Sequence, residues 1–294
     1  MTQLNNLHIR PALPTDKPTI LNFCQHTWNN ETDYIASVWD LWSADLSGHI
    51  LVADFNGQPI GMTRLVQLST TEGWWEALRV DRAYRRQGIG TKLINAALDL
   101  SHSLGLTTVR ACVSVANTSM HPLMNQQGFK PLGNHAVYSA EATDSAPTAL
   151  KQLRPQDCER VWATINRFAL EEGDRLFVVR GAKWQSLTPE ILAQQLKQGW
   201  VWGVSNGDDL VSLFIRSQME NPDGTFWIGW LGGTQTGLSL ALEDLCSLAY
   251  ELKFQSVGGF LPQSNSLLPL AKAVGYQIFE TSTYRIYAKS LDET

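Results

Sequence analysis

A short loop between a predicted strand and a predicted helix contains the residues that could most readily bind a charged ligand. Its sequence is Arg85-Arg86-Gln87-Gly88-Ile89-Gly90-Thr91. Gly88 and Gly90 lack side chains, so the chain can turn sharply there and a ligand can approach the backbone N–H groups. Those groups lie at the start of a helix, where unpaired amides and the helix dipole favour an anion. Because Arg85 and Arg86 add donors suited to phosphate oxygens, the loop predicts a diphosphate site, although a bare glycine pair is usually only a turn.

The elements that must position this loop follow a mixed α/β order. Asn56-Gly57 favours a β-hairpin turn, Thr15 or Asp16 can cap the first helix, and Gly105 can end the helix that follows the loop. The predicted strands cover residues 7–11, 49–55, 60–68, 74–80, 107–115 and 129–138. The predicted helices follow Thr15-Asp16 and cover residues 34–45, 90–104 and 119–127.

A faint internal repeat indicates that the fold occurs twice. Arg10-Pro11 recurs as Arg154-Pro155, Asn56-Gly57 as Asn206-Gly207, Asn117 as Asn265, and Gly128-Phe129 as Gly275-Tyr276. The four matches keep the same order at nearly constant spacing. The small, polar stretch 141–148 reads as a linker. We therefore expect a domain at 1–140, a linker at 141–148 and a second domain at 149–294.

Composition excludes several classes of protein. The formal net charge of -5 argues against a dedicated nucleic-acid binder, which needs a basic face. The N-terminus lacks a signal-peptide pattern and no apolar run is long enough to cross a bilayer, so we expect a cytoplasmic protein without a membrane partner. Cys24, Cys112, Cys158 and Cys246 form no CxxC pair, so we expect no structural metal.

The loop with its flanking residues resembles the acetyl-CoA loop of the GNAT (Gcn5-related N-acetyltransferase) superfamily. That family has Arg or Gln, two residues, Gly, one residue, and Gly or Ala, after a strand that ends in an apolar-x-Val step. Arg85 to Gly90 fit this pattern, and Leu78-Arg79-Val80 precede it at the expected distance. Asn117 and Gly128-Phe129 fit a second signature of the family. The resemblance covers about residues 7–140.

This resemblance implies how acetyl-CoA, the cosubstrate, is held. Backbone groups around Leu78 and Val80 would pair with the pantetheine arm. Amides from Arg86 to Thr91, which include Gln87, Gly88, Ile89 and Gly90, would bind the diphosphate. Asn117 would bind near the pantetheine end, and it can also act as a helix N-cap.

Glu76 is a candidate general base, because acetylation of an amine needs a group that takes up a proton. Residues two apart on a strand share a face, so Glu76 is expected beside the thioester. The residues expected on that face are Glu72, Trp74, Glu76, Leu78 and Val80. Flanking Trp74 and Trp75 would exclude water from the carboxylate. A solvated strand carboxylate is an equally weighted alternative.

Two positions depart from familiar family members. The general-acid Tyr of many members is Met124 here, and the Glu base of the ribosomal-protein Nα-acetyltransferases is Cys112. His121 could substitute as the acid, but a surface residue of the helix is the favoured reading.

The corresponding loop of the second half is Gly232-Gly233-Thr234-Gln235-Thr236-Gly237. With Gly237 aligned to Gly90, Gly232 replaces Arg85 and Gln235 replaces Gly88. Both arginines and the turn glycine are therefore lost. Leu238, Leu242, Leu245, Ala249 and Leu252 keep the spacing of a core-facing helix. The second half is thus predicted to be a degenerate copy without strong CoA binding.

The sequence predicts an α/β protein of two tandem GNAT-like domains that transfers an acetyl group to a primary amine. The acceptor, a small-molecule or protein amine, would be set by the first two helices and by residues 29–34. A CoA-responsive sensor with lapsed catalysis is the alternative, and a duplicate that binds no ligand is a third reading. A monomer or a homodimer is expected.

Overall fold

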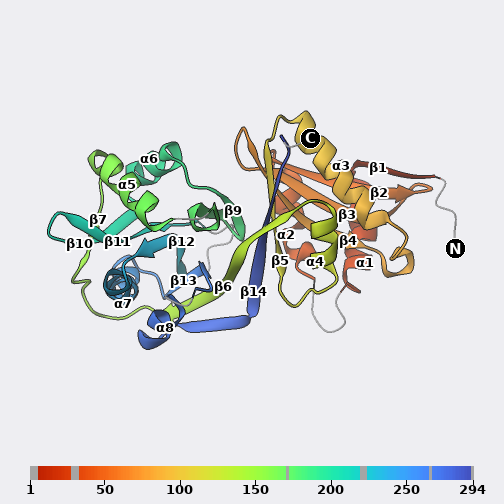
Figure 1. The fold of residues 1–294 in the computed structure, drawn as a ribbon. Helices are drawn as coiled ribbons and strands as arrows, with labels where there is room; N and C mark the ends of the chain where they lie inside the picture. Colours follow the sequence, from red (N-terminus) through yellow and green to blue (C-terminus); the bar gives the residue numbers. More distant parts are fainter. Residues whose placement is uncertain (1–5, 28–32, 170–171, 219–223, 265–266, 293–294) are drawn as a thin grey trace. The chain divides into compact units, whose positions relative to one another are not determined.

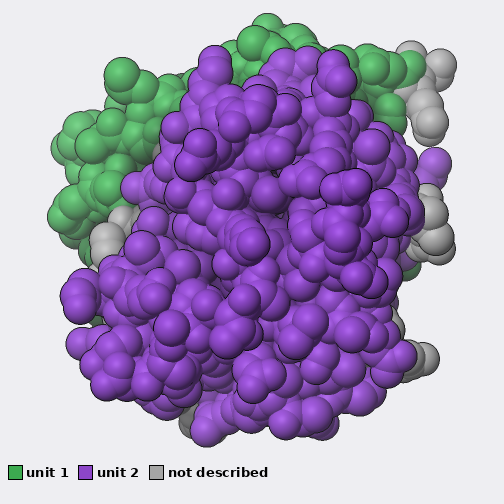
Figure 2. Space-filling view, turned by 90° about the vertical axis from the view of Figure 1, so that its left-hand side faces the viewer, with its two compact units in different colours: residues 1–111, 125–129, 288–294 green, residues 112–124, 130–287 purple. Residues whose placement is uncertain are grey.

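The computed structural model describes residues 6–27, 33–169, 172–218, 224–264 and 267–292. The chain forms two compact units, each built on a mixed sheet with helices (Figure 1). Unit 1 comprises residues 1–111, 125–129 and 288–294, and unit 2 comprises residues 112–124 and 130–287 (Figure 2). The predicted α/β class with a duplicated fold is therefore confirmed.

Unit 1 contains the strands and helices expected for the first half of the sequence up to the start of β5. Its strands are β1 (Leu7–Pro11), β2 (Gly48–Phe55), β3 (Gln58–Gln67), β4 (Glu72–Val80) and the start of β5 (Thr108–Ser114). Its helices are α1 (Lys17–Cys24), α2 (Ile35–Ala44) and α3 (Ile89–Ser103). Short 3-10 turns lie at Pro14–Asp16 and Arg82–Tyr84. Each bound lies within a few residues of its prediction.

The sheet of unit 1 has the order β1-β2-β3-β4-β5. Neighbouring strands are antiparallel from β1 to β4, whereas β4 and β5 are parallel. The turn between β2 and β3 is made by Asn56 and Gly57, whose φ angles of 54° and 82° are both left-handed. This is the hairpin turn that the Asn-Gly pair predicts.

Helices cover both faces of this sheet. Because side chains alternate along a strand, neighbouring residues of β2 belong to different cores. Val52 packs with the buried side chains of α1 and α2, among them Phe23 and Trp39. Ala53 packs with Ile89 of α3. The loop before α3 is thereby held at the end of β4 by a packed helix.

Unit 2 repeats this arrangement. Its strands are β6 (Lys130–Glu141), β7 (Leu150–Gln152), β8 (Leu176–Arg180), β9 (Lys183–Ser186), β10 (Val201–Asn206), β11 (Asp209–Arg216), β12 (Thr225–Gly233), β13 (Ser256–Pro262) and most of β14 (Gln277–Ser290). Its helices are most of α4 (Met120–Gln126), α5 (Cys158–Phe168), α6 (Pro189–Lys197), α7 (Gln235–Glu251) and α8 (Leu267–Ala273). Short 3-10 turns lie at Pro155–Asp157 and Glu172–Arg175.

Strand order shows the duplication most clearly. In unit 2 the order is β14-β6-β13-β12-β11-β10-β7, and β8 and β9 form a separate hairpin. The run β7-β10-β11-β12-β13 matches the run β1-β2-β3-β4-β5 of unit 1. In both runs the parallel pair is the fourth strand with the fifth.

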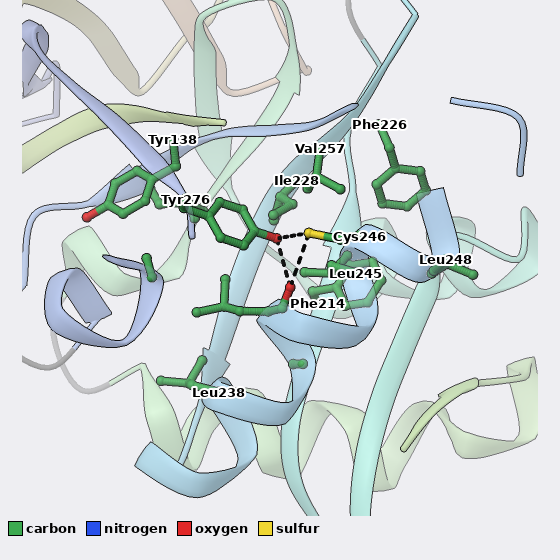
Figure 3. Close-up of a cluster of buried hydrophobic side chains, with 14 of the residues drawn as sticks. Tyr138, Phe214, Phe226, Ile228, Leu238, Leu245, Cys246, Leu248, Val257 and Tyr276 are labelled. Atoms are coloured by element: carbon green, nitrogen blue, oxygen red, sulfur yellow. Dashed lines mark hydrogen bonds between the residues drawn. The ribbon is translucent and has the colours of Figure 1, made fainter. Parts of the chain in front are cut away.

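The core of unit 2 encloses a tyrosine among apolar side chains (Figure 3). The hydroxyl of Tyr276 donates to the carbonyl oxygen of Leu242 at 3.0 Å, and Sγ of Cys246 lies 3.8 Å from the same hydroxyl (Figure 3). Burial raises the pKa of Tyr276 well above its ordinary value. The buried hydroxyl therefore stays protonated and has a hydrogen-bond partner.

Three segments belong to a unit that the order of the sequence would not suggest. Residues 112–124 and strand β6 precede residues 141–148 yet belong to unit 2, and residues 288–294 at the end of the chain belong to unit 1. In unit 1 the N–H of Leu291 donates to the carbonyl oxygen of Thr107 at 2.8 Å. The predicted boundaries describe the duplication along the sequence, whereas the compact units exchange terminal segments.

Two expected details of the fold are wrong. Asp16 makes no side-chain cap to α1, because its carboxylate accepts from the backbone of Leu13 and from Arg10, each at 2.7 Å. Leu252 was expected in the core, but α7 ends at Glu251 and Leu252 is 42% exposed. None of the helices in the described ranges has the length and apolar character to cross a membrane.

Candidate functional site

Strand β4 has neighbours on both sides only at its start. Its parallel register with β5 covers Glu72, Gly73 and Trp74. Its antiparallel register with β3 continues to Val80, which pairs with Gly61. In the described part of the chain, residues 75–80 therefore have a strand partner on the β3 side alone. Their backbone groups on the other side can pair with an extended ligand.

A β-bulge at Ala77 changes which face of the sheet the following β4 side chains point to. Ala77 has a φ of 62°, and the register with β3 shifts at this point. Glu76 lies on the face of α2, and Ala77 joins the core of α1 and α2. Leu78 packs on the opposite face with α3.

This bulge overturns one expectation about β4. The residues predicted to share one face were Glu72, Trp74, Glu76, Leu78 and Val80. That prediction is wrong, because the extra residue in a bulge reverses the alternation of side chains beyond it. Glu76 therefore points away from the face that carries Leu78 and Val80.

The loop after β4 folds back on the end of the strand. The side chain of Asp81 accepts from the N–H of Ala83 at 2.9 Å and starts the 3-10 turn Arg82–Tyr84. Nε of Arg85 donates to the carbonyl oxygen of Val80 at 3.0 Å. Arg86 takes a left-handed φ of 63°. Both arginines are exposed beside the start of α3.

The start of α3 is open to a ligand. Gly88 is the N-cap, with a left-handed φ of 77°, and it supplies no side-chain cap. A Cβ at Gly88 would meet no atom within 4 Å. A Cβ at Gly90 would lie 3.6 Å from Cδ2 of Leu78, so helix and strand approach closely here. The amides of the first turn are thus left for an external acceptor.

The loop is suited to a diphosphate. Its first-turn amides and the helix dipole favour negative charge, and two exposed guanidinium groups lie beside them. Unit 1 brings together the predicted loop residues from Arg85 to Thr91 with Leu78 and Val80 of β4. This geometry fits a ligand with an extended arm along β4 and a diphosphate at α3.

Glu76 lies in a buried charge cluster that the sequence analysis missed. Nη1 of Arg64 donates to Oε1 of Glu76 at 2.5 Å, and Nη2 donates to Oδ2 of Asp45 at 2.5 Å. The guanidinium of Arg64 is fully buried and lies 4.6 Å from the ring centre of Trp42. Two carboxylates therefore share the guanidinium of Arg64.

A second ion pair joins β4 to the start of α2. Arg79 donates from Nε to Oδ2 of Asp33 at 2.6 Å and from Nη2 to Oδ1 at 3.1 Å. Burial alone would lower the pKa of Arg79, but the bonds to Asp33 outweigh it and raise the pKa. An arginine between apolar residues of a predicted strand was the available signal for both Arg79 and Arg64.

The remaining predicted residues lie in unit 2. Oδ1 of Asn117 accepts from the hydroxyl of Ser119 at 2.9 Å in the turn before α4, and its role toward a ligand stays a prediction. Met124 is fully buried, and its side chain has no proton to donate as a general acid. His121 is not a free surface residue, since its ring nitrogens lie 2.9 Å from Oη of Tyr287 and 3.2 Å from the carbonyl oxygen of Val115. Asn265 and residues 29–32 lie outside the described residues.

Unit 2 keeps the strand geometry of this site but closes the helix start. The register of β12 with β11 shifts around Gly229, as that of β4 does around Ala77. The N-cap of α7 is Thr234, whose Oγ1 accepts from the N–H of Gly237 at 3.1 Å. Gly88 and Thr234 are both N-caps, so Thr234 is the structural equivalent of Gly88. The sequence alignment instead places Gln235 at that position. One of the amides that an anion would need is already bound.

Unit 2 also buries a histidine on β6. His135 is 5% exposed, and burial lowers the pKa of its imidazole from 6.5 to about 4. The folded protein therefore resists protonation of His135 that the unfolded chain accepts. The neutral His135 ring therefore adds its full contribution to the free energy of unfolding above pH 6.5, and this contribution falls as the pH drops toward 4.

We expect His135 to reduce the free energy of unfolding by about 3 kcal/mol between neutral pH and pH 4, from a shift of about 2.5 pKa units. Urea unfolding of the intact protein and of His135→Phe across this range measures the effect. The variant cannot titrate, so its stability should fall less steeply. Parallel curves for both proteins would show that His135 is not responsible.

Other kinds of site find little support in the structure. A hollow of about 490 Å³ in unit 1 lies between α2 and the start of β2, and none of the predicted site residues lines it. No group of three or more His, Cys, Asp or Glu residues suited to a metal occurs among the residues described.

Known proteins resemble the chain in part by sequence and throughout by fold. Residues 16–129 match the family model described as Acetyltransferase (GNAT) family. No curated protein matches the sequence. The matched segment contains β4, the loop and α3, so the sequence likeness is centred on the site of unit 1.

Solved structures resemble almost the whole chain. A GCN5-related N-acetyltransferase from Sphaerobacter thermophilus is 15% identical over 97% of this chain and 96% of its own, with a TM-score of 0.61. One from Kribbella flavida is 14% identical over 97% and 71%, with a TM-score of 0.50. A tandem GNAT protein from the clavulanic acid biosynthesis pathway is 14% identical over 97% and 98%, with a TM-score of 0.52. At these identities the likeness shows the fold, which is that of tandem GNAT proteins.

Proposed function

Residues 16–129 are a GNAT-family acetyltransferase domain, and from this we propose that the chain transfers an acetyl group from acetyl-CoA to a primary amine. The observation that carries the proposal is the uncapped start of α3 beside the edge of β4 that has no strand neighbour beyond Trp74 within the described residues. An anion-binding helix start and an open strand edge together accept a ligand that is anionic at one end and extended at the other.

Residues of unit 1 would hold the cofactor in two parts. Backbone groups around Leu78 and Val80 would bind the pantetheine arm along the open edge of β4. The amides of residues 86–91, with Arg85 and Arg86, would bind the diphosphate. The bound cofactor supplies an acyl carbon activated as a thioester.

Glu76 is the proposed general base in a direct attack by the amine. Its carboxylate is held by Arg64 on the face of β4 opposite Leu78, which leaves it little freedom to move. The two carboxylates of Glu76 and Asp45 favour the approach of a cationic amine. Because amines are protonated at neutral pH, the amine must lose a proton before attack, and in this proposal Glu76 accepts it.

The proposal extends to the whole chain. A catalytic copy at 1–140 is joined through 141–148 to a degenerate copy at 149–294, in which Thr234 caps the helix start. The acceptor would be a small-molecule or protein amine, and the enzyme would act in the cytoplasm as a monomer or homodimer without a metal.

The direct test is release of free CoA thiol from acetyl-CoA across a panel of primary amines. We expect at least one amine to accelerate release and to gain an acetyl group, detected by mass spectrometry. Gly88→Glu serves as the control that lacks the cofactor site. Tight acetyl-CoA binding without turnover on any amine would contradict the enzyme and favour the alternative.

That alternative is a CoA-binding sensor whose catalysis has lapsed. The observation in its favour is Met124, which is fully buried. At this position many family members have a tyrosine that acts as general acid. Catalysis without that tyrosine remains feasible, because a CoA thiolate is a good leaving group. The amine panel separates the two functions.

Glu76→Gln should lower turnover by about 100-fold, with the largest loss at low pH, where more of the amine is protonated. Rates measured from pH 6 to pH 9 check this. Asp45→Asn is the matched control, because it removes the other carboxylate bound to Arg64 and leaves the proposed base intact. An unchanged pH–rate profile in Glu76→Gln, or the same change in both variants, would remove Glu76 from the mechanism.

A further inference from the structure

Strands β12 and β13 of unit 2 separate beyond a short parallel pairing. Their register ends at Ile228 and Gly259. Beyond this point, among the described strands, β12 pairs only with β11 and β13 pairs only with β6. A cavity of about 250 Å³ lies where the two strands diverge, and all of its lining residues belong to unit 2. Two strand edges therefore face a cavity within one unit.

The backbone hydrogen bonds of β12 indicate which of its groups face the cavity. The N–H of Thr234 donates to the carbonyl oxygen of Val211 on β11 at 2.7 Å. Bonded pairs alternate along an antiparallel ladder, so Gly232 also faces β11, whereas Leu231 and Gly233 face the opposite side. Both of these residues line the cavity. Their N–H and C=O groups are thus directed to the cavity, where no strand of the described chain pairs with them.

Strand β13 presents backbone groups from the other side of the cavity. The N–H of Gln263 donates to the carbonyl oxygen of Asn134 on β6 at 2.9 Å. By the same alternation, Leu261 faces β6 and Phe260 faces away from it. Phe260 also lines the cavity. Donors and acceptors of the main chain therefore face the cavity from both strands.

The cavity occupies the place in unit 2 that the proposed pantetheine site occupies in unit 1. The N–H of Asp81 donates to the carbonyl oxygen of Ile60 at 2.9 Å, which is the counterpart of the bond from Thr234. Leu231 precedes Thr234 by three residues, as Leu78 precedes Asp81. The same backbone positions are thus open in both units.

The surroundings of the cavity disfavour an anionic ligand. Oγ1 of Thr234 accepts from the N–H of Gly237 at 3.1 Å, so the nearby helix start is capped. Among the described residues that line the cavity there is no Lys or Arg, and Asp174 is part of the wall. A phosphate or carboxylate would therefore lose its hydration without gaining a counter-charge. The geometry suits a chain of neutral hydrogen-bonding groups.

We propose that this cavity binds an extended peptide segment without acidic side chains, which pairs with the backbone of Leu231, Gly233 and Phe260. A strand repeats its donors and acceptors on one side every two residues, or about 6.6 Å, which matches the spacing from Leu231 to Gly233. Addition of a peptide to an open strand edge is a recurring mode of recognition. The site is independent of acetyl transfer in unit 1.

The test compares N-acetyl-L-alanyl-L-alanine N-methylamide with its analogue that is methylated on both alanine nitrogens and so lacks these two donors. Calorimetry on the full chain should give one dipeptide per chain, bound at least about tenfold more tightly than the analogue. Leu231→Pro should weaken dipeptide binding by at least about tenfold, because proline lacks the N–H that faces the cavity. Leu78→Pro is the equivalent change in unit 1 and should keep the dipeptide affinity within about twofold.

A second measurement needs no substitution. Hydrogen exchange of the intact protein, followed by mass spectrometry, should slow at residues 231–233 and at Phe260 when the dipeptide saturates, and should stay unchanged at residues 75–80. Absence of saturable binding, equal affinity for the two probes, or unchanged exchange at residues 231–233 would overturn the proposal. A loss of binding in Leu78→Pro alone would overturn its assignment to unit 2. Saturable binding of pantetheine without binding of the dipeptide would overturn the assignment to a peptide.

Discussion

Gly88→Glu is expected to remove measurable binding of acetyl-CoA. The new carboxylate would lie at the start of α3, where it would repel the diphosphate and bind the same amides. We expect the affinity to fall by at least about 100-fold, since two charge-assisted hydrogen bonds of about 1.5 kcal/mol each correspond to that factor. Calorimetric titration of acetyl-CoA measures the loss. No atom within 4 Å of the new Cβ obstructs folding.

Gly57→Glu is the matched control for this substitution. Gly57 has a φ of 82°, close to the 77° of Gly88, and a Cβ there also meets nothing within 4 Å. Both variants therefore carry similar backbone strain and the same added charge. Gly57 lies in the turn between β2 and β3, so the affinity should stay within about twofold. Undiminished affinity in Gly88→Glu, or an equal loss in both variants, would refute the assignment of the loop.

Arg79→Met is expected to lower the free energy of unfolding by about 3–5 kcal/mol, the cost of leaving one member of a buried ion pair alone. Asp33 is 5% exposed and would keep its charge without the two bonds that Arg79 donates. Asp33 also accepts from the N–H of Ile35 at 3.2 Å, so the pair anchors the start of α2 to β4. Urea unfolding followed by circular dichroism measures the change.

The double variant Arg79→Met with Asp33→Asn tests the cause of this loss. Asparagine keeps an oxygen acceptor for Ile35 and removes the unpaired charge. We expect the double variant to recover more than half of the stability that Arg79→Met loses. A loss below about 1 kcal/mol in Arg79→Met, or no recovery in the double variant, would show that the ion pair contributes little.

The order of the elements could be predicted because local signals agree with the fold. Asn56-Gly57 predicts the left-handed hairpin turn, and Gly88 is the left-handed N-cap of α3. The duplication followed from a few residue pairs at nearly constant spacing, and the strand order of the two units confirms it. The turn and cap signals depend on residues that are close in sequence, and the duplication depends on short motifs that recur in the same order in both halves.

The arrangement around Glu76 could not be predicted, because it depends on register. Ala77 is an ordinary strand residue, and its type gives no sign of a left-handed φ or of a bulge. Without the bulge, Glu76 and Leu78 would share a face. The partner Arg64 lies on another strand, and its pairing follows from the β3–β4 register that the bulge interrupts.

The exchange of terminal segments between the units was equally hidden. Alternation along β6 and β14 indicates strands, but it does not say which unit a strand joins. The same limit applies to His135, an isolated histidine in the sequence. Its burial beside a cavity follows from the pairing of β6 with β13, across residues far apart in the chain.

The stoichiometry of acetyl-CoA binding tests the central proposal most directly. Unit 1 has an uncapped glycine at its helix start, and unit 2 has Thr234 bound across the equivalent turn. Calorimetric titration of the intact protein should therefore give one acetyl-CoA per chain. Two molecules per chain, or no saturable binding, would contradict a single cofactor site at the loop of unit 1.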